Sequence, residues 1–169
     1  MGKSRTPSKP YILRRWRLDD NHFYTCARPG RTGDPKTKAV GVPDDIVHRW
    51  VLGLPGPQTV IVSLLGCKPN GQSEFGFYSF HGRDEHTDQS SRSVSFSEWL
   101  RRSQPGVELR EHPTLDFNPV PAEQQHEIAQ DVLRLIADGR TVVIVDSGGQ
   151  QRSVSVCAFL GAVEDSATS

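Results

Sequence analysis

The chain has 169 residues, which is enough for one domain with a hydrophobic core. Its 20 basic and 20 acidic residues give a formal net charge of zero, which provides no electrostatic basis for binding nucleic acid or a membrane surface. No apolar run approaches the roughly 20 residues needed to cross a bilayer, and the three cysteines, an odd number in a chain without a signal peptide, predict a reducing, cytoplasmic environment.

Basic residues gather at the start of the chain, where six of them precede the first acidic residue, Asp19. Charge runs of this kind are usually solvated. Residues 1–18 are therefore predicted to form a flexible basic segment, with contact to an anionic partner as the alternative. Residues 19–165 are predicted to form a single domain.

The hydrophobic pattern predicts strands and helices in alternation. In chain order these are a strand over 23–28, a helix over 44–52, strands over 59–65 and 76–80, a helix over 95–102, a strand over 107–111, a helix over 121–138, a strand over 142–145 and a helix over 154–161. This order predicts an α/β fold with a mainly parallel central sheet and helices on both faces. Ligands of such sheets bind beyond the carboxyl ends of the strands.

The most informative stretch is TVVIVDSGGQQRS, residues 141–153. A β-branched run breaks into Ser147-Gly148-Gly149, and a helical pattern follows. A strand, a glycine turn and a helix N-terminus together present converging backbone N–H groups to an anion, and the helix dipole adds partial positive charge. Arg152 follows Gln150 and Gln151 where the loop enters the helix, and its planar guanidinium suits two hydrogen bonds to phosphate. The stretch therefore predicts a phosphate-binding loop.

A second polar group lies upstream, in HPTLDFNPVP at residues 112–121. Asp116 stands in this proline-rich segment, directly before the predicted helix over 121–138. From its position alone, Asp116 could cap this helix or stabilise a turn.

The spacing of residues 145–153 resembles the phosphate loop of cysteine-dependent protein tyrosine and dual-specificity phosphatases, which reads His-Cys-x-x-Gly-x-x-Arg-Ser/Thr. In this register Gly149 matches the family glycine, Arg152 the phosphate-binding arginine and Ser153 the hydroxyl residue that follows. The cysteine position falls on Asp146 and the histidine position on Val145. A register that puts Ser147 at the nucleophile would shorten the loop by one residue and displace the glycine.

The resemblance implies a fold like that of dual-specificity phosphatases, with the family order of acid segment, helix, strand and phosphate loop across 107–161. It implies that Asp146 is at the nucleophile position and Asp116 at the general-acid position, and that Arg152 and Ser153 complete the catalytic set. It also implies a phosphate-binding loop formed by Ser147, Gly148, Gly149, Gln150, Gln151 and Arg152. No metal or other cofactor is implied.

An aspartate at the nucleophile position changes the chemistry, because a carboxylate is a poorer nucleophile than a thiolate. Removal of a nucleophile can cost on the order of a million-fold in rate. The sequence is therefore interpreted as an inactive or strongly impaired protein phosphatase, a pseudophosphatase that acts by binding a protein partner, with a phosphorylated protein or another phosphate ester as a further ligand.

Several alternatives stay open from the sequence. The chain could be an active phosphomonoesterase that uses Asp146 with Mg²⁺, or one whose unsubstituted parent is active. Arg152 could pair with Asp146 and close the loop. The Gly-Gly turn could also belong to an unrelated α/β protein.

Overall fold

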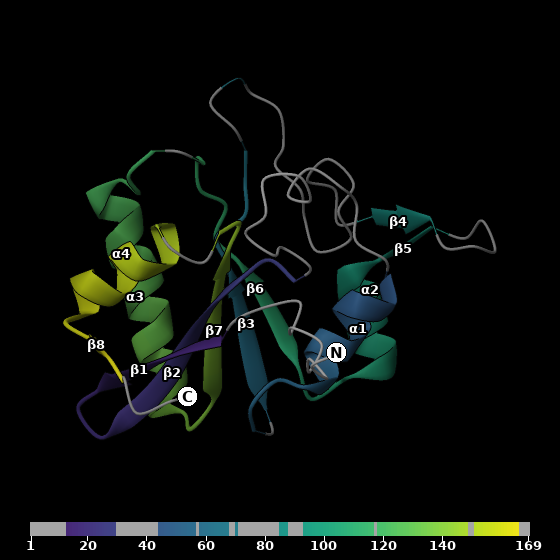
Figure 1. The fold of residues 1–169 in the computed structure, drawn as a ribbon, viewed down its shortest axis with the longest axis horizontal. Coiled ribbons are helices and arrows are strands. Elements are labelled where there is room, and N and C mark those ends of the chain that lie inside the picture. The colour runs from purple at the N-terminus through teal and green to yellow at the C-terminus, as the bar shows by residue number, and fades with distance from the viewer. Residues whose placement is uncertain are drawn as a thin grey trace, which may run out of the picture.

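The computed structural model describes residues 13–29, 44–56, 58–67, 70, 85–87, 93–116, 118–148 and 151–165 (Figure 1). The strand predicted over 76–80 and the loop residues Gly149 and Gln150 lie outside the described residues.

A six-stranded sheet forms the centre of the molecule, in the order β6-β3-β7-β2-β1-β8. The strands are β1 (Leu13–Leu18), β2 (Asn21–Ala27), β3 (Thr59–Ser63), β6 (Glu108–Glu111), β7 (Thr141–Asp146) and β8 (Val163–Glu164). The first four in spatial order pair in parallel, and the last two join as antiparallel strands. The predicted α/β fold with a mainly parallel sheet is confirmed.

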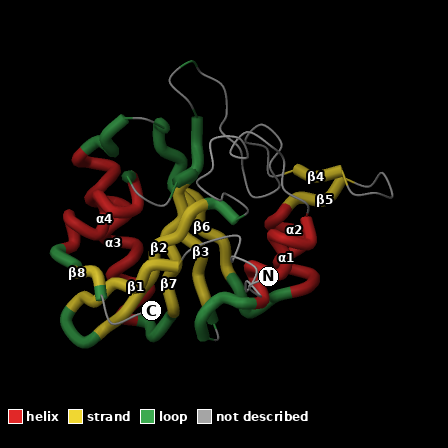
Figure 2. The backbone as a smooth tube through the Cα atoms, viewed as in Figure 1, coloured by secondary structure: helices red, strands yellow, loops and turns green. Residues whose placement is uncertain are grey.

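Helices cover both faces of this sheet, as the tube in Figure 2 shows. Helices α1 (Asp44–Leu52) and α2 (Phe96–Ser103) lie on one face, and α3 (Ala122–Ala137) and α4 (Arg152–Leu160) lie on the other. A separate hairpin is formed by β4 (Glu85–Thr87) and β5 (Ser93–Ser95). None of the helices in the described part of the chain is both long and apolar enough to cross a membrane.

The prediction of a flexible segment over 1–18 is wrong for residues 13–18, which form β1 at the side of β2. Trp16 is buried in this strand, and its indole Nε1 donates a hydrogen bond of 2.9 Å to Thr25 Oγ1. One of the strand's basic side chains, Arg14, pairs with a residue near the other end of the chain, because Glu164 accepts two hydrogen bonds from it, of 2.7 and 2.9 Å. Residues 1–12 lie outside the described residues.

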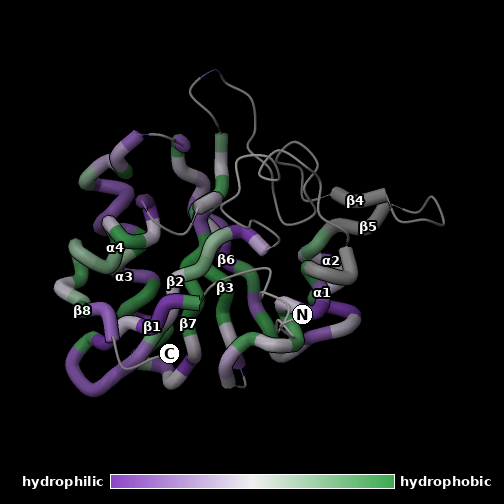
Figure 3. Tube along the Cα trace, viewed as in Figure 1, coloured by the Kyte–Doolittle hydropathy of each residue, from purple (hydrophilic) through white to green (hydrophobic). Residues whose placement is uncertain are grey.

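Alternate side chains of the central strands fill two cores. Val60, Val62, Val142 and Ile144 pack beneath α3 and α4, whereas Ile61, Val143 and Val145 pack against α1 and α2. Figure 3 shows the resulting apolar centre, with β3 and β7 in its middle. Because both faces are buried, β3 and β7 read as continuous β-branched runs. Their carboxyl ends meet at one edge of the sheet, where the candidate site lies.

Candidate functional site

Asp146 is the last residue of β7, and its side chain turns toward the start of α4. The residue is only 2% exposed, and its Oδ2 accepts a hydrogen bond of 3.0 Å from the backbone N–H of Ser153. Gln151, at the N-cap of α4, makes no side-chain capping bond. Asp146 therefore supplies a carboxylate acceptor to the first turn of α4, where the helix dipole favours negative charge.

Arg152 is the first residue of α4 and is 4% exposed. Its Nη1 donates to the carbonyl oxygen of Leu64 at 3.2 Å and to Thr114 Oγ1 at 3.0 Å. Its Nη2 lies 3.2 Å from Asp116 Oδ1 in an ion pair whose two side chains are 4% and 13% exposed. The structure thus brings the arginine of the loop together with the carboxylate of the upstream segment.

The other predicted loop residues lie around this pair. Ser147 is half-buried, and Gly148 and Gln151 are exposed. Ser153 is completely buried, and its hydroxyl has no hydrogen-bond partner among the described residues. Gly149 and Gln150, in the middle of the loop, lie outside the described residues.

A cleft of about 270 Å³ opens beside Arg152. It is lined by one segment that follows Asp116 and by the first turn of α4, namely Asn118, Pro119, Val120, Gln151, Arg152 and Ser155. The wall is held together by Gln125 of α3, whose Nε2 donates to the Ser155 carbonyl oxygen at 2.9 Å. The cleft is therefore shared between the two predicted motifs.

The segment that carries Asp116 is fixed to the end of β3 by four backbone hydrogen bonds. They run from His112 N to Ser63 O (2.8 Å), Thr114 N to Leu64 O (3.2 Å), Cys67 N to Thr114 O (3.2 Å) and Asp116 N to Cys67 O (2.7 Å). The approach is so close that a Cβ on Gly66 would lie 2.2 Å from the Thr114 carbonyl oxygen. Asp116 thus lies at the end of residues 112–116, which extend the pairing of β6 and β3 beyond the two strands.

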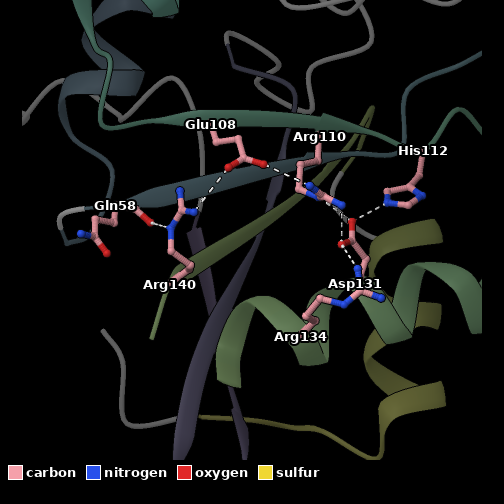
Figure 4. A network of polar contacts seen from close by, with 7 residues as sticks. All are labelled: Gln58, Glu108, Arg110, His112, Asp131, Arg134 and Arg140. Atoms are coloured by element: carbon pink, nitrogen blue, oxygen red, sulfur yellow. Dashed lines mark hydrogen bonds and ion pairs between the residues drawn. The ribbon is translucent and has the colours of Figure 1, made fainter. Parts of the chain in front are cut away.

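The base of this segment is anchored by the polar network of Figure 4. Asp131 of α3, 6% exposed, accepts two hydrogen bonds of 2.7 Å from Arg110 and lies 2.8 Å from His112 Nε2. Burial of this carboxylate raises its pKa, but the hydrogen bonds from Arg110 and then His112 outweigh that effect, so the pKa of Asp131 lies below its ordinary value. Arg110 also contacts Glu108 at 3.2 Å.

Neither of the two buried cysteines offers a thiolate in place of Asp146. Burial raises the pKa of Cys26 to about 12, against a smaller opposing effect of a hydrogen bond with Trp50. Burial likewise raises the pKa of Cys157 to about 12. Cys67 is half-buried, and its carbonyl oxygen accepts a hydrogen bond from the Asp116 backbone N–H. Within the described ranges, no group of three His, Cys, Asp or Glu side chains is placed to hold a metal ion.

The sequence did not indicate two of these residues, Thr114 and Asp131. Thr114 acts through a buried hydroxyl whose main acceptor is a backbone carbonyl, and no residue pattern marks such a partner. Asp131 has a weak signal, because a charged residue interrupts the apolar face of the helix between Ile128 and Val132.

No protein-family model matches the chain, and no curated protein matches it in sequence. Among solved structures, two forms of Tk-PTP are similar to it in the arrangement of helices and strands. The active form has 18% sequence identity and a TM-score of 0.47, over 83% of this chain and 67% of that chain. A glycine-to-alanine mutant form has 17% identity and a TM-score of 0.45, over 86% and 69% of the two chains.

Proposed function

We propose that this chain is a protein tyrosine or dual-specificity phosphatase-like domain whose active site is inactive or strongly impaired. In this proposal the domain comprises residues 19–165 together with β1, and it acts in the cytoplasm by binding a protein partner. The observation that carries the proposal is the 3.0 Å contact between Asp146 Oδ2 and the Ser153 N–H. At the position where the resemblance implies a cysteine thiolate, this chain has a buried carboxylate. This carboxylate accepts a hydrogen bond from a backbone N–H in the first turn of α4.

A phosphate is attracted to such a loop by the N–H groups of the helix N-terminus and by the arginine, and in this protein two carboxylates of the chain itself contact these groups. Asp146 accepts the first-turn N–H of α4, and Asp116 pairs with Arg152. A phosphate dianion at ~4 Å from a carboxylate would be repelled by roughly 4 kcal/mol per charge pair at an effective dielectric constant of 20. A phosphorylated protein or other phosphate ester must overcome this repulsion, which favours a role through protein binding over turnover.

The test is turnover of para-nitrophenyl phosphate by the parent protein, in chelator and with Mg²⁺, beside the Asp146→Cys variant. The proposal expects negligible turnover by the parent under both conditions and measurable turnover by Asp146→Cys. A further change, Asp116→Asn in the Asp146→Cys background, should slow the reaction by about 10²–10⁴-fold if Asp116 is the general acid.

Robust metal-free turnover by a parent from which all three cysteines have been removed would contradict the proposal. Turnover that requires Mg²⁺ and is lost in Asp146→Asn would assign instead the aspartyl-phosphate chemistry considered from the sequence. A folded Asp146→Cys variant without activity would place a further defect elsewhere in the site.

A further inference from the structure

We propose that Thr114 is a positioning residue for Arg152, and that its hydroxyl sets the direction in which the guanidinium group points. The inference rests on the proposed function, because it concerns the same anion-binding arginine. Thr114 is 4% exposed and lies two residues before Asp116 on the segment that continues the sheet.

The hydroxyl of Thr114 is oriented by its own hydrogen bond. It donates its single proton to the Leu64 carbonyl oxygen, so only its lone pairs remain to face Arg152. Arg152 Nη1 donates to this oxygen at 3.0 Å. Because the proton is committed to Leu64, the hydroxyl acts toward Arg152 as an acceptor of fixed direction.

The Leu64 carbonyl oxygen is the common acceptor of this arrangement. It receives the Thr114 backbone N–H and Arg152 Nη1, each at 3.2 Å, besides the Thr114 hydroxyl. Residues two apart in an extended segment point to the same side, and Asp116 accordingly reaches Nη2 of the same guanidinium group. The two side chains and the carbonyl hold both terminal nitrogens of Arg152.

If Thr114 positions Arg152 through its hydroxyl, loss of that hydroxyl should change the rotation rate of the guanidinium group, whereas a change in packing alone should not. A guanidinium group held at both nitrogens rotates slowly about its Cζ–N bonds. Loss of the Thr114 oxygen removes the 3.0 Å hydrogen bond of Nη1 and leaves the longer, 3.2 Å bond to the Leu64 carbonyl oxygen, so this rotation should become faster. Valine has nearly the shape of threonine without the hydroxyl, and serine keeps the hydroxyl without the methyl group. Thr114→Val and Thr114→Ser therefore form a matched pair that separates the hydrogen bond from the packing.

The direct measurement is nitrogen-15 NMR of the arginine side chains in the full-length parent, with the Arg152 signals assigned through Arg152→Lys. We expect separate, slowly exchanging Nη–H signals for Arg152 in the parent and in Thr114→Ser, and faster exchange between these signals in Thr114→Val. The melting temperature of each variant is measured beside the spectra. An averaged Arg152 signal in the parent itself would overturn the inference without any variant, and so would exchange in a folded Thr114→Val that is as slow as in the parent.

Binding of orthovanadate supplies the second readout, in the Asp146→Ala background, where an internal carboxylate has been removed. Thr114→Val should weaken vanadate binding about tenfold, the size expected for one hydrogen bond to a charged group. Thr114→Ser should change it little. Equal vanadate affinity in Thr114→Val and its background would contradict the inference. Phosphatase activity in the parent would contradict the proposed function instead, and the NMR result stands apart from that outcome.

Discussion

Arg110 and Asp131 join the edge strand β6 to helix α3 through two hydrogen bonds of 2.7 Å. His112, the first residue of the segment that carries Asp116, contacts the same carboxylate at 2.8 Å. Arg134 lies 3.8 Å from Asp131 on its own helix, so three cationic or protonatable side chains surround one largely buried acid (Figure 4). This carboxylate therefore links the end of β6 to α3 directly before the residues that lead to Asp116.

Replacing Asp131 with asparagine should lower the free energy of unfolding by about 2 kcal/mol at pH 7, because Arg110 loses a two-oxygen charged acceptor. The pKa of Asp131 is lowered in the folded state, so its stabilising contribution is present above the unfolded pKa of about 4. It is lost as the pH falls through the folded pKa. Urea unfolding between pH 7 and pH 3 should show the difference between parent and Asp131→Asn shrinking toward low pH.

The matched control for Asp131 is Glu108→Gln. Glu108 also contacts Arg110, at 3.2 Å, but its side chain is 40% exposed. Exposed ion pairs contribute up to about 1 kcal/mol, so this variant should lose less stability than Asp131→Asn. Equal losses of unfolding free energy in the two variants would show that burial of Asp131 does not increase its contribution to stability.

Gly66→Ala tests the close approach between the end of β3 and the acid segment. The new Cβ would lie 2.2 Å from the Thr114 carbonyl oxygen and 2.7 Å from its nitrogen, so the two backbones must separate. We expect a loss of about 1–3 kcal/mol in the free energy of unfolding. Gly106→Ala is the control, because a Cβ at Gly106 meets no atom within 4 Å, and this variant should unfold like the parent. Denaturant unfolding of both variants measures these free energies. A Gly66→Ala variant as stable as the parent would contradict the prediction.

The cysteines differ in accessibility, which predicts their reactivity. Cys26 and Cys157 are buried, and burial raises the pKa of each thiol to about 12, whereas Cys67 is half-buried. Since the thiolate is the reactive form, iodoacetamide at pH 8 should modify the folded protein at Cys67 alone. Peptide mass spectrometry after brief labelling gives the answer. Early modification of Cys157 would mean that α4 opens on the timescale of labelling.

The central sheet was predictable because its strands carry local signals. The β-branched runs of β3 and β7 and the apolar spacing of α3 depend on neighbouring residues alone, and the predicted ranges differ from the observed ones by one or two residues at most ends. Strand β1 was not predictable, because its basic residues became part of a sheet only through pairing with β2 and through Glu164 at the other end of the chain.

Part of the candidate site was likewise predictable from the sequence, and part was not. The resemblance to phosphatases implied that Asp116 and Arg152 belong to one site, and in the structure their side chains form an ion pair at 3.2 Å. The contacts of Arg152 with the Leu64 carbonyl oxygen and with Thr114 depend on the register between β3 and the acid segment. Register is a property of the folded sheet, so no spacing within the motif could indicate it.

Asp146→Ala should improve anion binding at the loop, because the parent's own Asp146 carboxylate occupies the Ser153 N–H. The change removes the carboxylate from the Ser153 N–H but leaves the first turn of α4 and Arg152 in place. Phosphate, sulfate or vanadate should therefore bind more tightly to Asp146→Ala than to the parent, because repulsion is relieved while the donors remain. Calorimetric titration at low salt measures the difference.

The gain in Asp146→Ala should depend on the positive charge of Arg152, which is 4% exposed and therefore weakly screened. Arg152→Met in the Asp146→Ala background should lose most of the added affinity. Gln151→Ala is the matched control, because Gln151 is the exposed neighbour that makes no side-chain capping bond, and it should change the affinity little. If Asp146→Ala binds anions no better than the parent, the carboxylate does not compete with the ligand, and the alignment of Asp146 with the family cysteine is wrong.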